Sequence, residues 1–417
     1  MTESSEATRA RRAAEAAARE SYGKLIAIVA AKSRDIAAAE DALADAFAAA
    51  LATWPERGVP ERPEAWLLTA ARRNVLHRAR HDRVREGAVQ ELLVRAQQHG
   101  DEDAWPDERL KLLFVCAHPA IDPTIRTPLM LQTVLGLDAE RIGSAFLVAP
   151  STMGQRLVRA KAKIKAAGLR VEVPEAAELP ARLRDVLHAI YVAYGSGWEE
   201  PSRGVGLTQE AIFLGRLVVG LLPDEPEPKG LLALMLFCES RRDARRDALG
   251  RFVPLSAQDP ARWTRDDIVE AEALLVDASR ARRFGRFQCE AAIQSVHAQR
   301  AITGVLQHAA LRTLYDLWMA YEPSVGVAVS RAAACLDAGD RVCAREALAA
   351  LDSHDVVAYQ PFWVTMARLA ELEGDEATAR VHLTRALGLT EDPALRRFLA
   401  DRLAAAWPWP SFGVPRR

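Results

Sequence analysis

Apolar residues recur along most of the chain at steps of three and four residues, the spacing that places them on one face of an α-helix. Leu43, Phe47, Leu51 and Trp54 follow this spacing. No stretch keeps the alternation of apolar and polar residues that marks a strand. The pattern predicts an all-α protein, and we expect Leu43, Phe47 and Leu51 to be committed to a domain core.

Four clusters of proline, glycine and acidic residues interrupt the helical pattern, at 54–60, 100–107, 195–201 and 223–228. Such clusters end helices, because proline disfavours helical geometry in the residue before it. With the motifs below, they divide the chain into six expected segments. These are a flexible N-terminus (1–18), a first helical domain (19–87), a linker (88–107), a second helical domain (108–170), a helical extension (171–405) and a tail (406–417).

Composition narrows the class of protein only a little. The 417 residues suffice for several domains, half of them are hydrophobic, and a net charge of −1 argues neither for nor against nucleic acid. The five cysteines are widely spaced and include no CxxC pair, so we expect free thiols of a reducing cytoplasm, without disulfides or a zinc site. No signal-peptide core or membrane-length apolar run is present, which predicts a cytoplasmic protein with no membrane partner.

The first basic element lies at the end of a predicted helix that opens near Pro63. Six arginines fall between Arg72 and Arg85, against one acid, Asp82. Guanidinium groups suit phosphate oxygens, and a tryptophan suits stacking on unpaired bases. The alternative is the solvated charged face of an ordinary surface helix. The candidate DNA contacts of this element are Trp66, Arg72, Arg73, Asn74, His77 and Arg80.

The second basic element predicts a helix-turn-helix. A short helix capped by Asp138 ends near Phe146, and after a break a second helix, capped by Ser151, runs to Lys165. Met153, Leu157, Ala160 and Ile164 form its apolar stripe. Six basic residues and no acid lie between Ser151 and Arg170. In a helix-turn-helix the second helix enters the major groove.

The expected contacts with duplex DNA on this second helix are Ser151, Thr152, Gln155, Arg156, Arg159, Lys161 and Lys163. Polar residues near its start would reach base edges, and later lysines and arginines would neutralise phosphates. Gly154 weakens the helix by up to about 1 kcal/mol relative to alanine. A chance helix pair with a basic surface is the alternative.

Taken in order, these elements resemble the extracytoplasmic-function (ECF) class of sigma factors, which direct bacterial RNA polymerase to promoters. Residues 41–47, with Glu40 before them and Trp54 after, look like the polymerase-binding helix of sigma region two. Residues 65–72 resemble the helix that melts and captures the minus-ten element. Residues 137–164 resemble the region-four helix-turn-helix that reads the minus-thirty-five element. The resemblance implies that Glu40, Asp41 and Asp45 bind polymerase.

Closer sequence similarity points to the ECF subgroup with a tetratricopeptide-like C-terminal extension. The segments that carry this resemblance are 54–60, 107–119, 153–161, 223–226 with 230–234, and 291–293 with 296–298. Two positions depart from the ECF pattern, since Arg73 and His77 stand where asparagine and aspartate are frequent. Cys116-Ala117 replaces the two adjacent cysteines of the subgroup. The resemblance implies a small YCII-like companion protein with a DGPF motif as a partner.

A repeat in the C-terminal half supports the same assignment. Gly339-Asp340 recurs as Gly374-Asp375, an offset of 374 − 339 = 35 residues, close to the roughly 34-residue tetratricopeptide period. Stacked helix pairs of this kind form a concave surface for a peptide or protein. Generic helical packing is the alternative.

The sequence contains no phosphate loop, nucleophile elbow or metal-spaced His/Glu motif, so we expect no enzyme, cofactor or metal. The expected protein is an alternative sigma factor. It would bind core RNA polymerase, direct transcription initiation at specific promoters and be regulated by its extension. The alternative is a polymerase-independent helix-turn-helix regulator or a helical-repeat scaffold.

Overall fold

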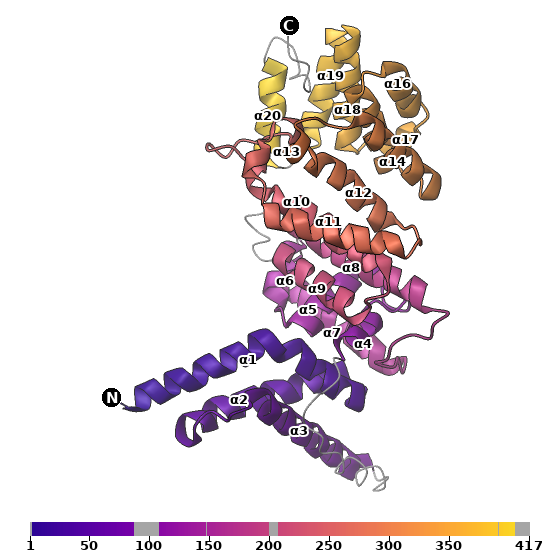
Figure 1. The fold of residues 1–417 in the computed structure, drawn as a ribbon. Coiled ribbons are helices and arrows are strands. Elements are labelled where there is room, and N and C mark those ends of the chain that lie inside the picture. Colours follow the sequence, from indigo (N-terminus) through magenta and orange to yellow (C-terminus); the bar gives the residue numbers. More distant parts are fainter. Residues whose placement is uncertain (1, 87–107, 147, 200–206, 391, 405–417) are drawn as a thin grey trace. The chain divides into compact units, whose positions relative to one another are not determined.

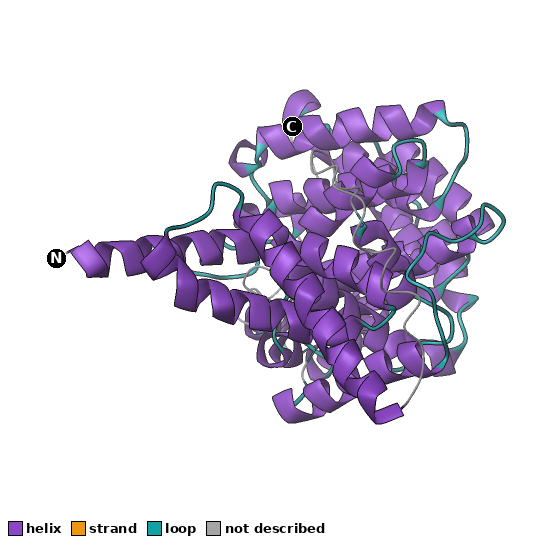
Figure 2. Ribbon diagram, turned by 90° about the horizontal axis from the view of Figure 1, so that it is seen from below, coloured by secondary structure: helices purple, strands orange, loops and turns teal. Residues whose placement is uncertain are grey.

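The computed structural model describes the chain except for residues 1, 87–107, 147, 200–206, 391 and 405–417, so the expected linker and the whole of the expected tail lie outside the described residues. The predicted all-α class is confirmed. The described residues form helices and no β-strand, apart from an isolated bridge between Arg246 and Phe252 (Figure 2). Among them, none of the helices combines the length and apolar character that crossing a membrane requires. The chain divides into two compact units, residues 1–214 and 215–417 (Figure 1).

Unit 1 begins with one long helix, which shorter helices follow. Its helices are α1 (Thr2–Ser33), α2 (Ile36–Arg57), α3 (Pro63–Glu86), α4 (Arg109–Cys116), α5 (Pro123–Leu135), α6 (Ala139–Ala145), α7 (Pro150–Ala166), α8 (Leu179–Glu199) and the first half of α9 (Leu207–Leu221). Helix α1 starts at Thr2 and so runs through the segment 1–18 that was expected to be a flexible N-terminus. Ala10, Ala14 and Ala17 are already buried there, which fixes the N-terminal turns by packing.

The core face of α2 differs from the predicted stripe. The buried residues of this helix include Leu43 and Trp54, together with several alanines. Phe47 is only partly buried and Leu51 is 48 % exposed, so the expected commitment of both to the core is corrected. The alanines explain the rotation of the face, because small side chains let α1 and α3 pack closely against α2.

The second half of unit 1 includes part of the expected extension. Helix α8 packs on α4 and α5, with Val186, Leu187 and Ile190 buried. The compact unit therefore runs past the expected boundary at 171 to residue 214. The predicted break at 195–197 is also corrected, since α8 continues to Glu199. A glycine inside a helix costs only about 1 kcal/mol relative to alanine, which the packing of this helix offsets.

Unit 2 is a succession of packed helices. It contains the end of α9, α10 (Pro226–Ser240), η2 (Arg242–Arg245), η3 (Leu255–Ala257), η4 (Pro260–Arg262), α11 (Arg265–Arg280), α12 (Arg286–Ala298), α13 (Arg300–Thr303), α14 (His308–Tyr321), α15 (Val325–Asp337), α16 (Arg341–Ala349), α17 (Ser353–Val356), α18 (Gln360–Glu373), α19 (Glu376–Gly388) and α20 (Pro393–Ala404). Helix α10 packs against both α11 and α12, and it is buried on nearly every side.

The two copies of the Gly-Asp motif form turns of the same geometry, between α15 and α16 and between α18 and α19. Gly339 has φ 81° and Gly374 has φ 83°, a left-handed conformation that favours glycine. Each aspartate then caps the next helix, because Asp340 accepts from the Cys343 N–H and Asp375 from the Thr378 N–H, both at 3.0 Å. One expectation about cysteines is corrected here, since Cys335 and Cys343 pair as a disulfide between α15 and α16.

Candidate nucleic-acid interface

Helices α6 and α7 form the helix pair that the sequence predicts. The Asp138 carboxylate accepts from the Arg141 N–H at 2.7 Å, as expected for a cap of α6. The chain then doubles back, and the Val148 N–H donates to the Gly143 carbonyl at 2.8 Å. A Cβ atom on Gly143 would lie 2.6 Å from the Val148 oxygen, so this tight turn depends on glycine.

The start of α7 differs from the prediction, while its apolar stripe agrees. The expected Ser151 cap is corrected, because α7 begins at Pro150 after Ala149, which makes no side-chain capping bond. Proline suits this first position, since its missing N–H would have no partner within the helix. The four residues buried on α7 are those of the predicted stripe, Met153, Leu157, Ala160 and Ile164.

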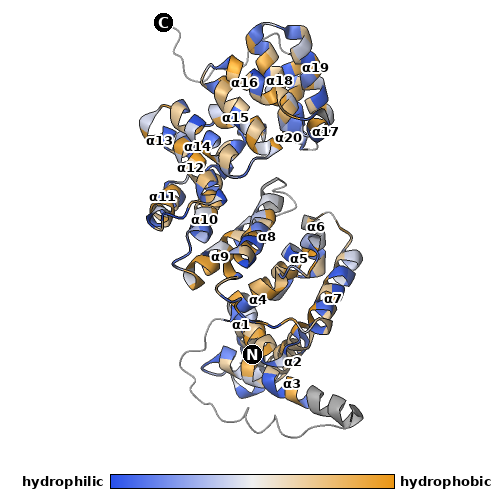
Figure 3. Cartoon of the chain, turned by 90° about the vertical axis from the view of Figure 1, so that its right-hand side faces the viewer, coloured by the Kyte–Doolittle hydropathy of each residue, from blue (hydrophilic) through white to orange (hydrophobic). Residues whose placement is uncertain are grey.

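Hydrophilic residues alternate with hydrophobic ones along α7 (Figure 3). Six of its predicted DNA contacts are exposed: Ser151, Thr152, Gln155, Arg156, Arg159 and Lys163. An amphipathic helix with hydroxyl, amide and guanidinium groups on its free face can donate to base edges and to phosphates. The seventh predicted contact, Lys161, is not part of this free face. Its side chain is 9 % exposed and its amine lies 2.5 Å from the Glu40 carboxylate.

The predicted contacts on α3 fall into two groups. Arg73 and His77 are exposed. Trp66 is half-buried, with its ring edge-on to the Trp54 ring at 5.6 Å between centroids.

Asn74 and Arg72 are also half-buried. The Asn74 amide donates to the Ala42 carbonyl at 3.2 Å, which ties α3 to α2. Burial lowers the pKa of Arg72. Arg80 belongs to α3, but its side chain lies outside the described residues. The structure thus brings Arg73 and His77 to the surface and packs Trp66, Arg72 and Asn74 partly into the domain.

The three predicted polymerase contacts on α2 do not share one environment. Asp41 and Asp45 are exposed, four residues apart on the same face. Glu40 is half-buried and bonded to Lys161 of α7. The pKa of Glu40 is raised, because burial raises it by more than the neighbouring Lys161 ammonium lowers it. Glu40 therefore faces α7 of its own chain.

Sequence reasoning missed a second ion pair between the same helices. Asp35, which caps α2 by accepting from the Ala38 N–H, also lies 2.7 Å from the Lys165 amine. No local sequence pattern predicts this ion pair, because Asp35 and Lys165 are 130 residues apart in the sequence (165 − 35). Only the packing of α7 beside α2 brings the two charges together.

The side chains of Cys116 and His118 both contact neighbouring groups of the fold. The Cys116 sulfur lies 3.2 Å from the Thr133 hydroxyl, and burial raises the pKa of this thiol to about 12. His118 accepts from the Ala120 N–H through Nδ1 at 3.1 Å. Within the described residues, no group of three or more histidine, cysteine, aspartate or glutamate side chains is arranged to hold a metal ion.

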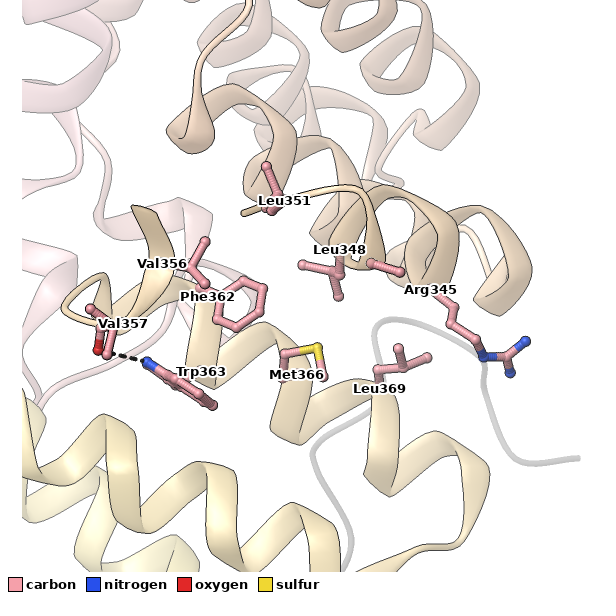
Figure 4. A pocket seen from close by; sticks show the side chains of 10 residues that line it. Arg345, Leu348, Leu351, Val356, Val357, Phe362, Trp363, Met366 and Leu369 are labelled. Carbon is pink, nitrogen blue, oxygen red and sulfur yellow. Dashed lines mark hydrogen bonds between the residues drawn. The ribbon is translucent and has the colours of Figure 1, made fainter. Parts of the chain in front are cut away.

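Unit 2 contains a cavity of about 440 Å³ between α16, α17 and α18 (Figure 4). Its wall is mostly apolar, and Leu348, Phe362 and Met366 contribute to it. The Trp363 indole N–H donates to the Val357 carbonyl at 3.2 Å, which fixes the ring in the wall. Arg345 is the charged residue of the lining. The space suits an apolar group.

Comparison with known proteins identifies relatives without an assigned activity. Residues 182–279, from α8 to α11, match a family of unknown function, DUF6596. An uncharacterized protein of Rhizobium meliloti (strain 1021) is 38 % identical over 314 residues, which cover 72 % of this chain and 74 % of that protein. No solved structure matches the chain. The identity and coverage establish that the chain belongs to the same family as the Rhizobium meliloti protein.

Proposed function

We propose that this chain is an alternative sigma factor of the ECF class, which binds core RNA polymerase and directs transcription initiation at specific promoters. The observation that carries the proposal is the pair α6 and α7. The apolar side of α7 is buried, and its other side exposes six polar or basic residues. In this proposal α2 and α3 belong to sigma region two, and α4 to α7 belong to region four.

The two regions would act on DNA by different physical means. Arg156 and Arg159 on α7 would donate to base edges or phosphates in the major groove of the duplex upstream element. Arg73 and His77 on α3 would bind the melted downstream element, where strand separation exposes both phosphates and bases. Asp41 and Asp45 on α2 would pair with basic residues of the polymerase.

The helices after α7 would regulate the sigma factor. Helix α8 already belongs to the same compact unit as α6 and α7. The later helix pairs, which share the Gly-Asp turn, would form a tetratricopeptide-like surface for a peptide or a small YCII-like companion protein. Transcription reactions with and without the companion protein test this part of the proposal.

Reconstitution with purified core polymerase tests the proposal as a whole. The full chain should co-purify with core enzyme and initiate transcription from a subset of a genomic-fragment library. Binding to duplex fragments without any association with core enzyme would favour a polymerase-independent regulator. Binding to neither would favour a helical-repeat scaffold, and either result would refute the sigma-factor assignment.

A further inference from the structure

A disulfide joins the end of α15 to the first turn of α16. Cys335 on α15 is fully buried, at 0 % exposed, whereas Cys343 on α16 is partly exposed. Their Cα atoms are 6.1 Å apart, a separation at which a disulfide can form without movement of the backbone. The other three cysteines of the chain carry free thiols. This pair is therefore the place where two cysteines of the chain can change between thiols and a disulfide.

The second copy of the Gly-Asp turn has the same geometry without a disulfide. At the repeat offset of 35 residues (374 − 339), Ala370 stands where Cys335 does and Thr378 stands where Cys343 does. In both copies the N–H of the aspartate donates to the carbonyl of the first of these residues at 2.9 Å. In both copies the aspartate carboxylate accepts from the N–H of the second at 3.0 Å. The cysteines of the first copy therefore add a bond to a turn whose geometry is complete without one.

The disulfide lies in the same apolar core as the wall of the cavity in unit 2. Cys335 belongs to one buried cluster, and Cys343 packs against that cluster. The cluster also contains residues that line the cavity, among them Leu348 and Phe362 (Figure 4). Leu348 follows Cys343 by five residues (348 − 343) on α16. The bond and one wall of the cavity are therefore parts of the same short helix.

Helix α16 depends on its neighbours for stability. It has nine residues, and isolated helices shorter than about 12–15 residues are marginal in water. Its buried residues are Ala344 and Leu348, and it packs on α15 and α18. A covalent bond from its first turn to α15 therefore adds a restraint to a helix that few buried side chains hold.

We propose that Cys335 and Cys343 form a reversible thiol–disulfide switch, which a hydroperoxide oxidises and which, when oxidised, fixes α16 as a preformed wall of the cavity. The inference rests on the proposed function, because a chain that serves RNA polymerase works in the reducing cytoplasm. In that compartment disulfides are rare, and those that form are usually transient and redox-sensing. A bond that the turn does not need for its geometry is suited to such regulation.

The oxidation takes place in two displacement steps. Cys343 is the third residue of α16, where the positive end of the helix favours a thiolate. This thiolate attacks one oxygen of the hydroperoxide and breaks the O–O bond, which gives a sulfenic acid at Cys343 and an alkoxide that takes up a proton to become an alcohol. The Cys335 thiol then loses its proton and attacks the Cys343 sulfur, and the hydroxide that leaves combines with this proton as water. Two thiols and one hydroperoxide thus give one disulfide, one alcohol and one water, and a dithiol reductant reverses the bond by exchange.

Oxidation of the full chain followed by mass spectrometry tests the switch itself. The chain is reduced with dithiothreitol, treated with an equimolar amount of hydrogen peroxide, and then unfolded and alkylated. Cys335 should be joined to Cys343, while the other three cysteines are recovered as alkylated thiols. The dithiol of thioredoxin should then return the pair to thiols in the folded chain. Failure of the pair to form, or resistance of the bond to thioredoxin, would overturn the proposal.

Hydrogen exchange measures what the bond does to α16. In the oxidised chain the amides of α16 should exchange at least about tenfold more slowly than in the reduced chain, because the bond removes open conformations of the turn and the helix. The control variant Cys335→Ala/Cys343→Thr carries the residues of the second copy at both positions, so it should exchange like the reduced chain with or without peroxide. The amides of α19, which follows the second copy, should be the same in both states. Equal exchange of α16 in the two wild-type states would show that the bond does not hold this helix.

Binding of a fluorescent apolar probe, 1-anilinonaphthalene-8-sulfonate, measures the consequence for the cavity. A preformed site binds more tightly than one whose wall must first be ordered, so the oxidised chain should bind the probe at least about fivefold more tightly than the reduced chain. Met366→Arg, which places a charged side chain in the cavity wall, should remove this difference. Val342→Arg, at an exposed position of α16, should retain it. The same affinity in both wild-type states would show that the switch does not act on the cavity.

These measurements need no polymerase, so they separate the inference from the proposed function. A chain that shows the switch but never associates with core enzyme would refute the proposed function and leave the chemistry of the pair standing. A chain that initiates transcription but never forms the pair would refute the switch alone. In transcription reactions with core enzyme, peroxide should change the output of the wild-type chain and leave that of Cys335→Ala/Cys343→Thr unchanged. An equal response of the two chains would refute regulation through this pair.

Discussion

Ending the chain after Arg170 should unfold helices α6 and α7, although every residue of both helices is retained. Such a truncation removes α8, whose residues Leu183, Val186, Leu187 and Ile190 are each at most 3 % exposed. Full burial of one such side chain contributes about 1.5–3 kcal/mol, or about 6–12 kcal/mol for four. The whole stability of a domain is about 5–15 kcal/mol. The truncation therefore removes a stabilisation comparable with the total.

Specific polar interactions also disappear with α8. The Thr127 hydroxyl donates to the Ala189 carbonyl at 3.2 Å, and Arg182 donates to the Phe114 carbonyl at 2.5 Å. Arg126 also pairs with Asp185 at 3.1 Å. Thr127 is buried, so its hydroxyl would be exposed to water or left without this partner.

Thermal and urea unfolding followed by circular dichroism provides the assay. A chain that ends after Leu222 and keeps α8 and α9 should unfold cooperatively, whereas a chain that ends after Arg170 should not. Within the full chain, Ile190→Ala should destabilise unit 1 by about 2–5 kcal/mol. Arg184→Ala, at an exposed position of the same helix, should change stability by no more than about 0.5 kcal/mol. Cooperative unfolding of the shorter chain at the temperature of the longer one would refute this reasoning.

Three double variants test the interface, and one glycine variant tests the stability of α7. Gln155→Ala with Arg156→Ala should weaken binding to the upstream element by about 1–3 kcal/mol per base contact, measured by fluorescence anisotropy, and unchanged binding would exclude α7 as the reading helix. Asp41→Lys with Asp45→Lys should abolish co-purification with core polymerase, while Glu56→Lys with Glu61→Lys, at exposed positions, serves as the control, and a normal yield of the first variant would contradict the assignment of α2. Arg73→Ala with His77→Ala should reduce the slope of log affinity against log salt for a melted promoter by about 0.7 for each phosphate that is no longer neutralised, and an identical slope would remove these residues from the interface. Gly154→Ala should stabilise unit 1 by up to about 1 kcal/mol in urea unfolding, because its Cβ would meet only the Ala139 Cβ at 3.8 Å, and a decrease in stability would show that glycine is required there.

Local signals predicted the cap of α6 and the buried face of α7 well. The Asp138 cap and the stripe of Met153, Leu157, Ala160 and Ile164 are properties of short segments, and the structure has both. The same kind of reasoning erred on Ser151, because a proline one residue earlier had already begun α7. It also erred at Gly195–Gly197, where the packing of α8 on α4 and α5 overrides weak helix formers.

The environment of individual site residues depended on contacts between distant segments. In the sequence of α7 alone, nothing distinguishes Lys161 from the other basic residues of that helix. Its place beside Glu40 results from the position of α2, which is 121 residues away in the sequence. The burial of Glu40 and Lys161 and the exposure of Leu51 have this common origin, because each depends on which helices surround α2.

One sequence signal did carry this long-range information. Residues 25–30 read Leu-Ile-Ala-Ile-Val-Ala, an uninterrupted apolar run inside a helix rather than a stripe. A helix with one apolar stripe needs a packing partner on one side only. A helix that is apolar on every side must be covered on every side. Helices α2 and α3 cover one side of α1, so the run predicts a second partner, and α4 and α5 are that partner. Helix α1 therefore belongs to the cores of both predicted sigma domains. A large-to-small substitution such as Ile26→Ala should lower the unfolding midpoints of both domains together, whereas independently folding domains would respond separately.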